Sequence, residues 1–178
     1  MYRLIDLLAS FFGLVFALPV FLVVYLIGLF DTGSPIFLQE RVGKDKKPFI
    51  LVKFRTMSVD TQSVASHLAS QASITKLGAF LRKTKLDELP QLWNVLKGEM
   101  SLVGPRPNLF NQEELIQARD AKNVYSVRPG ITALAQIQNI DMSTPDKLAK
   151  TGLIMIKKMS LANYFLYIVK TGSGDAVK

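Results

Sequence analysis

The longest apolar stretch of the chain lies near its N-terminus, where no Asp, Glu, Lys, Arg or His occurs from Leu7 to Phe30. As one straight helix of roughly 24 residues, the stretch would reach about 36 Å, enough for the ~30 Å hydrocarbon core of a bilayer. A cleaved signal peptide fits poorly, because the stretch is too long and no small-x-small site closes it. The pattern predicts a membrane-embedded helix over residues 1–30, and hydropathy alone also allows a simple spanning anchor.

Pro19 lies near the middle of this apolar segment and predicts a kink, because proline lacks a backbone donor and clashes with the preceding turn. Arg3 precedes the segment. Basic residues also follow it closely, at Arg41, Lys44, Lys46 and Lys47. Lys and Arg favour the cytoplasmic side of a membrane, so both flanks are expected there. We therefore predict a re-entrant helix over 1–30 and a single integrated domain over 31–178 on the cytoplasmic face.

Two segments with strand-favouring composition, joined by turn residues, predict a small β-hairpin after the apolar segment. Pro35–Arg41 and Phe49–Met57 are rich in Ile, Phe and Val, and the Gly43–Pro48 stretch between them is typical of a turn. Ser58–Thr75 is mainly polar and predicts a loop or a loosely packed helix. It contains His67, which has no evident partner and is more typical of an ordinary surface residue.

Helical periodicity returns further along the chain and decides the fold class. Ile74–Lys83 and Leu86–Lys97 each place apolar residues on one face, and Gly98 is a natural stop for the second helix. Leu153–Lys170 mixes apolar side chains with lysines, which suits either an interfacial helix or an ordinary core helix. The expected fold is α+β and mainly helical, with amphipathic interfacial helices around the active site.

Charge and composition narrow the possible partners. The chain of 178 residues carries 22 Lys and Arg against 14 Asp and Glu, a net charge of +8 that suits anionic partners. With no cysteine and one histidine, a Cys-ligated zinc site and a multi-histidine metal site are excluded, so any metal must be oxygen-ligated. No basic run with interleaved aromatics occurs, which argues against nucleic acid as a partner.

The most suggestive chemistry is an acidic pair among basic residues. Asp87 and Glu88 are expected at a helix start, where unpaired N–H groups favour anions. Four cationic side chains flank the pair: Arg82, Lys83, Lys85 and Arg106. Asp87 as an N-cap and Glu88 as a dipole partner would explain the same positions structurally. Arg106 and Arg128 each lie in a Pro- and Gly-containing loop that suits phosphate binding or a plain surface turn.

Four ordered motifs carry a resemblance to a known family. They are Lys53–Met57 (KFRTM), Leu86–Gly98 (LDELPQLWNVLKG), Ser101–Pro107 (SLVGPRP) and Arg128–Thr132 (RPGIT). With the Pro-broken apolar segment, they resemble the bacterial sugar transferases, small monotopic polyprenyl-phosphate phosphoglycosyl transferases. The resemblance implies that a sugar phosphate moves from a UDP-sugar to polyprenyl phosphate, usually undecaprenyl phosphate. It places the enzyme in the bacterial inner (cytoplasmic) membrane, with its active site on the cytoplasmic face.

The resemblance also implies residue roles. Asp87 matches the nucleophile that forms a covalent phosphosugar and releases UMP, and Glu88 matches a ligand of Mg²⁺. Arg82, Arg106 and Arg128 are the candidate phosphate-binding arginines. Lys53 and Arg55 suit either the same pocket or a structural role in their strand. Nearby positive charge is expected to keep Asp87 ionised.

Some questions stay open at this stage. Many family members carry an acidic residue and aromatics where this chain has Gly152–Met155, so no site role is assigned to that region. The alternative function is a non-enzymatic, membrane-anchored basic adaptor that binds anionic lipid. The sequence does not identify the sugar, the glycan pathway or the oligomeric state.

Overall fold

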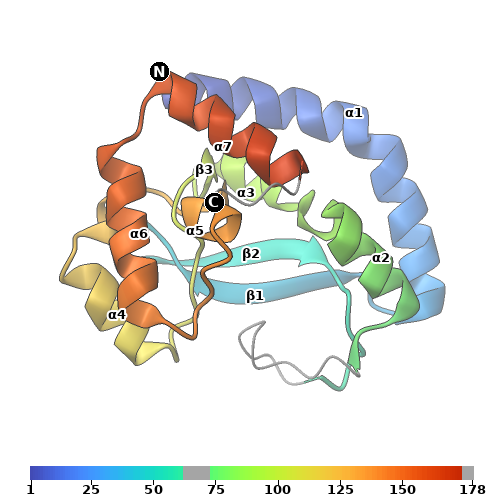
Figure 1. Ribbon diagram of the computed structural model, residues 1–178. Coiled ribbons are helices and arrows are strands. Elements are labelled where there is room, and N and C mark those ends of the chain that lie inside the picture. Colours follow the sequence, from blue (N-terminus) through green and yellow to red (C-terminus); the bar gives the residue numbers. More distant parts are fainter. Residues whose placement is uncertain (62–72, 174–178) are drawn as a thin grey trace.

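The computed structural model describes residues 1–61 and 73–173, which form a mainly helical body with a small two-stranded hairpin, as predicted (Figure 1). The helices are α1 (Tyr2–Asp31), α2 (Lys76–Thr84), α3 (Gln91–Lys97), α4 (Glu113–Asp120), α5 (Leu134–Ile137), α6 (Pro145–Lys157) and α7 (Leu161–Ser173). Single 3-10 turns are η1 (Lys44–Lys46), η3 (Leu86–Glu88) and η4 (Val124–Ser126). The strands are β1 (Ile36–Val42), β2 (Pro48–Phe54), β3 (Ser101–Val103) and β4 (Gly130–Thr132). His67 and most of the predicted polar loop lie outside the described residues.

The hairpin of β1 and β2 is antiparallel, and α3 packs on it. Phe49 and Leu51 of β2 join Val95 of α3 in one apolar cluster. The Asn94 side chain accepts a hydrogen bond from the Val52 N–H at 3.0 Å and donates one to the Ile50 carbonyl at 2.6 Å. One amide side chain thus pairs with an edge of β2 that would otherwise lack partners, and it fixes α3 against the hairpin.

The helix predicted to begin at Asp87 begins later. Leu86–Glu88 form the 3-10 turn η3, α3 starts only at Gln91, and no side-chain cap is made by Asp87. Here the Glu88 N–H bonds to the Lys85 carbonyl and the Leu89 N–H bonds to the Leu86 carbonyl, three residues back, so this segment forms a 3-10 turn rather than the first turn of an α-helix. Gly98 ends α3 with φ of 86°, as predicted.

A parallel pair of short strands, β3 and β4, brings two distant loops together. The backbones after β3 and before β4 approach closely at two glycines. A Cβ added at Gly130 would lie 2.0 Å from the Gly104 nitrogen, and one at Gly104 would lie 2.5 Å from the Arg128 carbonyl oxygen. Only glycine fits at this crossing. The sequence predicted the loops individually but not their contact.

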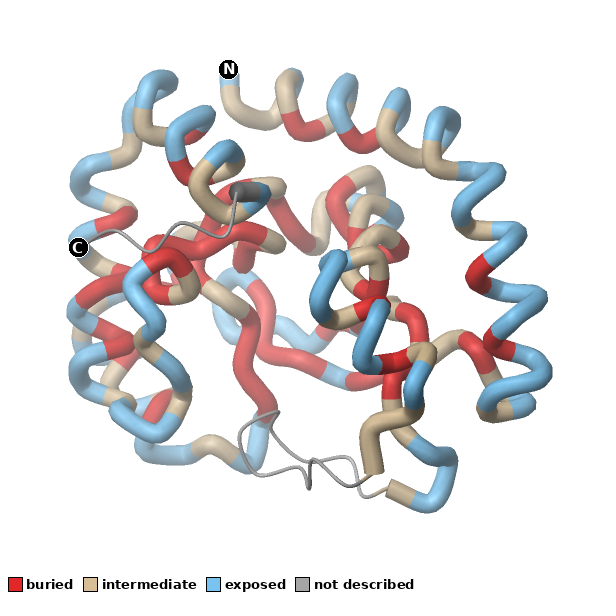
Figure 2. Tube along the Cα trace, turned by 45° about the vertical axis from the view of Figure 1, so that its right-hand side comes forward, coloured by how far each residue is buried: buried red, intermediate tan, exposed pale blue. Residues whose placement is uncertain are grey.

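The N-terminal helix α1 is continuous and contains Pro19, and its axis changes direction along its length (Figure 1). Its length and composition would allow it to cross a membrane, and only 11% of its most apolar window is buried. Most of the helix is therefore exposed along its outer side (Figure 2). Both ends contact the rest of the molecule: Arg3 donates to the carbonyls of Val95 and Leu96, and Thr75 Oγ1 donates to Asp31.

The predicted C-terminal apolar segment is divided between two helices. After α6 ends, the Ser160 hydroxyl accepts a hydrogen bond from the Asn163 N–H at 3.2 Å, near the start of α7. Tyr164 and Tyr167 of α7 are buried. Other α7 side chains are apolar and exposed: Leu161, Phe165, Leu166 and Val169. One face of α7 thus belongs to the core, and the other presents apolar groups outward.

Candidate active site

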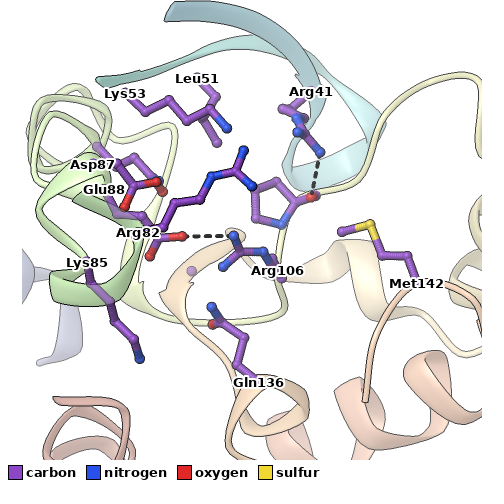
Figure 3. Close-up of a pocket in the computed structure, with 13 residues that line it drawn as sticks. Arg41, Leu51, Lys53, Arg82, Lys85, Asp87, Glu88, Arg106, Gln136 and Met142 are labelled. Atoms are coloured by element: carbon purple, nitrogen blue, oxygen red, sulfur yellow. Dashed lines mark hydrogen bonds and ion pairs between the residues drawn. The ribbon is translucent and has the colours of Figure 1, made fainter. Parts of the chain in front are cut away.

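A polar cavity of about 240 Å³ lies between the hairpin, the η3 turn and the loop after β3 (Figure 3). Its lining includes two carboxylates, Asp87 and Glu88, and five cationic side chains: Arg41, Lys53, Arg82, Lys85 and Arg106. Gln91 and Gln136 add amide groups. The excess of positive charge suits a ligand with at least two negative charges.

Asp87 is 8% exposed at the wall of this cavity. Burial, assisted by the neighbouring Glu88, raises the pKa of Asp87 to about 6, although Lys53, Arg106 and Arg82 act in the opposite direction. The nearby cations expected to keep Asp87 ionised do act in that direction, but desolvation opposes them and is the largest cause. At neutral pH the carboxylate is still mainly ionised, with little water around it.

Glu88 pairs with Arg106, whose Nη2 lies 2.8 Å from Glu88 Oε1. The Glu88 charge raises the pKa of Arg106 above its usual value. Arg106 belongs to the Gly104–Pro107 loop, where two prolines restrict the backbone on either side of it. The prediction that this loop would hold Arg106 beside the acidic pair agrees with its position.

A buried network supports the same loop from behind. Arg119 of α4 is 3% exposed, and its Nη1 donates to the Arg106 carbonyl oxygen and to Asn108 Oδ1, both at 2.8 Å. The Tyr125 hydroxyl donates to the same Asn108 oxygen at 3.0 Å. Burial lowers the pKa of Arg119. Nothing in the sequence indicated that Arg119 would reach this loop.

Arg82 and Lys53, two predicted phosphate-binding residues, line the cavity. Arg82 Nε donates to Thr56 Oγ1 at 2.9 Å, and the rest of its side chain extends into the cavity (Figure 3). Burial, followed by the charge of Arg41, lowers the pKa of Lys53 to about 8. Lys53 thus stays mainly cationic at neutral pH beside Asp87.

Arg55 and Arg128 are not brought to this cavity. Arg55 donates through Nε to the Ser34 carbonyl at 2.7 Å, and its guanidinium lies 5.3 Å from the Phe37 ring centroid. Arg128 donates through Nε to the Gly98 carbonyl at 2.7 Å and lines a different cavity beside Asp6. Their proposed phosphate contacts gain no support from these positions, and the structural alternative for Arg55 agrees with its contacts.

Arg41 was missed as a site residue. The sequence indicates only a basic residue that flanks the membrane segment, whereas the side chain is buried and lines the cavity. A usable signal was its place at the end of the first predicted strand, where a buried arginine requires a partner. Lys85 was noted only as a neighbour of Asp87, and it also lines the cavity while donating to the Thr171 carbonyl at 2.5 Å.

A second chamber of about 440 Å³ adjoins the first. Four residues line both: Lys85, Arg106, Gln136 and Met142. Asn139, Ile140 and Asp141 line only the second chamber. Together the two spaces fall within the usual range for small-molecule sites. The Gly152 region lines neither chamber. Gly152 instead lies where α6 approaches Val124, whose Cγ1 would be 3.3 Å from an added Cβ.

The acidic pair suits a hard cation with oxygen ligands. Within residues 1–61 and 73–173, no group of three or more acidic, histidine or cysteine side chains could hold a metal by itself. Mg²⁺ commonly takes one or two carboxylates and completes its shell with water and substrate phosphate oxygens. Asp87 and Glu88 are close enough for the charge of Glu88 to raise the pKa of Asp87. Two such neighbouring carboxylates fit a magnesium ion that arrives with a phosphorylated substrate.

In a comparison with known proteins, the sequence profile of the family described as bacterial sugar transferase matches residues 1–174. The chain belongs to the bacterial sugar transferase family. The predicted family resemblance is thereby confirmed. The acidic pair and the cationic cavity lie within the matched region.

Three curated relatives illustrate the range of this family. A UDP-galactose-lipid carrier transferase of Erwinia amylovora is 34% identical over 95% of this chain and 39% of its own length. A UDP-glucose:undecaprenyl-phosphate glucose-1-phosphate transferase of Klebsiella pneumoniae is 42% identical over 76% of this chain and 30% of its own length. A putative undecaprenyl-phosphate N-acetylgalactosaminyl 1-phosphate transferase of Bacillus subtilis is 45% identical over 59% and 60%, respectively.

The chain spans only part of most of these relatives. Among these three relatives and two further sugar transferases, the matched share of the relative's own length ranges from 30% to 67%. The names of the three relatives specify different sugars. The relatives thus share a general type of reaction but differ in the sugar, so membership of the family does not specify a sugar for this chain.

Proposed function

We propose that this protein transfers a sugar phosphate from a UDP-sugar to polyprenyl phosphate, in particular undecaprenyl phosphate, as the first membrane step of glycoconjugate assembly. The observation that carries the proposal is the pair Asp87 and Glu88 in a cavity with five cationic side chains. The names of the relatives support the donor and acceptor classes. The cationic side chains support the proposal because attack by a carboxylate on a diphosphate needs neutralisation of the negative charge at the site.

Asp87 is the nucleophile in this proposal. Its oxygen forms a bond to the sugar-linked phosphorus, the bond to the bridging oxygen breaks, and UMP leaves with that electron pair. Polyprenyl phosphate then attacks the same phosphorus, which releases Asp87 and yields a polyprenyl-diphosphate sugar. Burial supports this role, because a carboxylate with little hydration reacts more readily and its pKa of about 6 leaves it ionised at neutral pH.

Glu88 and Arg106 are the residues that control the charge around the attacked phosphate. Mg²⁺, when bound, would neutralise phosphate oxygens and act as a Lewis acid. Glu88 is the residue that would hold it together with substrate oxygens, and Arg106 Nη2, now 2.8 Å from Glu88, would then be able to turn to the phosphate. Arg82 and Lys53 supply further positive charge at the wall of the cavity.

The membrane arrangement is also part of the proposal. We infer that α1 enters and leaves the bilayer from one side, with its break at Pro19. Two contacts support this, because Arg3 and Asp31, at opposite ends of α1, both bond to the same globular body. Apolar side chains cover the exposed side of the helix: Phe11, Phe12, Val15, Phe16, Leu18, Leu22 and Val23. The exposed apolar face of α7 would lie at the same interface.

This arrangement suits the acceptor, whose tail stays in lipid while its phosphate lies at the headgroup level. The Tyr2 and Tyr164 rings stack with centroids 5.4 Å apart and place α7 beside the start of α1. An active site supported on these elements would lie near the membrane surface. We place it at the cytoplasmic face of the bacterial inner membrane, where the basic flanks of α1 are favoured.

The competing proposal is a membrane-anchored adaptor whose basic surface binds anionic lipid. It would account for the charge of +8 and the apolar helix. It gives no reason for two carboxylates inside a cationic cavity, where they would weaken lipid binding. For this reason the enzymatic proposal is favoured.

The two proposals differ in a direct assay. Purified protein in detergent or nanodiscs is incubated with a panel of UDP-sugars, Mg²⁺ and undecaprenyl phosphate, and UMP release is measured. The enzyme should release UMP from at least one donor, Asp87→Asn should release none, and Glu88→Gln should lose most Mg²⁺-dependent turnover. An adaptor would release UMP from no donor, and a fully active Asp87→Asn enzyme would remove the mechanism.

A further inference from the structure

Arg41 of β1 is a buried cation without an anionic partner among the described residues. It is 6% exposed, and its Nη groups donate to Gln39 Oε1 and, at 3.3 Å, to the Pro107 carbonyl oxygen. Its Nε has no hydrogen-bond partner. Burying a guanidinium among neutral acceptors is costly, because the charge loses its hydration without gaining an opposite charge. Such a position favours binding of an anion from outside the chain.

The position of Arg41 in the cavity indicates which anion it could meet. Arg41 lines the cavity on the side away from Asp87, and the guanidinium of Arg82 lies between them, with Arg106 close by (Figure 3). Arg106 is also near both groups, since its charge lowers the pKa of Arg41 and acts to lower that of Asp87. A phosphate held by Arg82 and Arg106 would therefore have Asp87 on one side and Arg41 on the other.

Displacement at phosphorus places the attacking and leaving oxygens roughly in line on opposite sides of the phosphorus atom. With Asp87 as the attacking group, the leaving oxygen points toward the Arg41 side. That oxygen belongs to the phosphate attached to the nucleoside. A guanidinium is well suited to this group, because its planar fork can donate two hydrogen bonds to phosphate oxygens.

We propose that Arg41 binds the leaving phosphate of the donor, the one that departs as part of the nucleoside monophosphate. The inference rests on the proposed function. When the Asp87 oxygen bonds to the sugar-linked phosphorus, the electron pair of the broken phosphorus–oxygen bond stays on the bridging oxygen, and the nucleoside monophosphate gains one negative charge. Arg41 stabilises that new charge and retains affinity for the released UMP.

A purely structural role for Arg41 would be to hold the Gly104–Pro107 loop through the Pro107 carbonyl. Arg119 already holds this loop through the Arg106 carbonyl without lining the cavity. The two roles predict different ligand dependence. Loss of a phosphate contact weakens binding of UMP but not of uridine, whereas a displaced loop affects both ligands or neither.

The test measures binding of UMP and of uridine, each titrated to millimolar concentration by calorimetry, to the full chain in detergent. Arg41→Gln should weaken UMP binding on the order of 10- to 100-fold, the usual effect of losing a charge-assisted hydrogen bond, with uridine affinity unchanged. Arg41→Lys keeps the charge and should fall between Arg41→Gln and wild type. Arg55→Gln is the matched control in the same hairpin, and its UMP affinity should equal that of wild type.

Three results would overturn the inference: wild-type UMP affinity in Arg41→Gln, equal losses for UMP and uridine, or identical UMP affinities in Arg41→Lys and Arg41→Gln. Thermal unfolding of each variant confirms that the compared samples are folded. UMP release by the wild-type enzyme tests the proposed function separately. A wild type that releases UMP, with an Arg41→Gln variant that binds UMP normally, would remove only the role of Arg41.

Discussion

Two cavities of the same volume, about 240 Å³ each, differ in how their charged groups are satisfied. In the cavity beside Asp6, that carboxylate accepts hydrogen bonds from Ser101 Oγ, the Leu102 N–H and the Tyr164 hydroxyl, at 2.6–3.0 Å. Its two arginines, Arg3 and Arg128, donate to carbonyls at the C-terminal end of α3.

The cavity beside Asp87 is not satisfied in this way. Arg41 has no carboxylate partner among the described residues, and burial together with Glu88 raises the pKa of Asp87 to about 6. Both cavities contain acidic and basic side chains. Of the two, only the cavity beside Asp87 contains charged groups whose missing partners a substrate could supply. Unsatisfied charge, rather than the presence of arginine or aspartate, therefore distinguishes the candidate active site.

The largest expected difference between the cavities is in activity after removal of one arginine. Arg106→Gln should lower the rate of UMP release roughly 100- to 1,000-fold, because it removes a fixed donor to the reacting phosphate. Arg128→Gln should change that rate less than about 3-fold, because Arg128 caps α3 on the other side. Initial rates per folded molecule provide the measurement. Equal losses of rate in the two variants would contradict the claim that only the cavity beside Asp87 takes part in the reaction.

The next effect concerns stability. The pKa of Asp87 is raised from 3.8 to about 6 on folding, so its stabilising contribution is complete below pH 3.8 and is lost as the pH rises through 6. Above that range, the ionised carboxylate lowers the free energy of unfolding by roughly 3 kcal/mol. Asp87→Asn should therefore be more stable than wild type at pH 8 in EDTA, and the gain should largely vanish at pH 4. A destabilised variant at pH 8 would contradict the account.

A smaller loss of stability is expected in the satisfied cavity. Tyr164→Phe removes the 2.6 Å hydrogen bond to Asp6, and should lower the free energy of unfolding by about 2 kcal/mol. Activity per folded molecule should stay near wild type. Denaturant titration and initial rates separate the two quantities. A large loss of kcat in a fully folded Tyr164→Phe sample would indicate that this cavity also takes part in the reaction.

The smallest effect is the dependence of the first half-reaction on pH. Only the ionised Asp87 attacks phosphorus, so kcat/KM for the donor should fall with decreasing pH, by about tenfold per unit below pH 6. The slope should flatten above pH 7. A profile whose midpoint lies near pH 4 would mean that burial does not control this carboxylate.

Local sequence patterns predicted the elements but not the long-range contacts between them. The apolar α1, the hairpin and α2 follow from hydrophobic periodicity, because short-range burial patterns decide them. The Gly104–Gly130 crossing depends on two loops 26 residues apart, and Arg41 reaches a loop 66 positions away in the chain. No local pattern specifies such pairings.

The candidate site was predicted in part for the same reason. The motifs correctly indicated Arg82 and Arg106 beside the acidic pair, and they also indicated Arg128, whose guanidinium lies on the far side of the β3–β4 crossing. The α-helix expected from Asp87 starts at Gln91, because the preceding residues form a 3-10 turn with bonds to carbonyls three residues back. Arg41 and Arg119 were missed because burial, which makes them informative, is a property of the folded chain.

The central claim is that Asp87 becomes bonded to phosphorus during each catalytic cycle. Intact-protein mass spectrometry after incubation with UDP-sugar and Mg²⁺, but without acceptor, tests it most directly. The account predicts a mass increase of one sugar phosphate, located on Asp87 by peptide mapping, absent from Asp87→Asn and removed when undecaprenyl phosphate is added. An active wild-type enzyme that gains no mass under rapid quenching, or a label retained in Asp87→Asn, would contradict it.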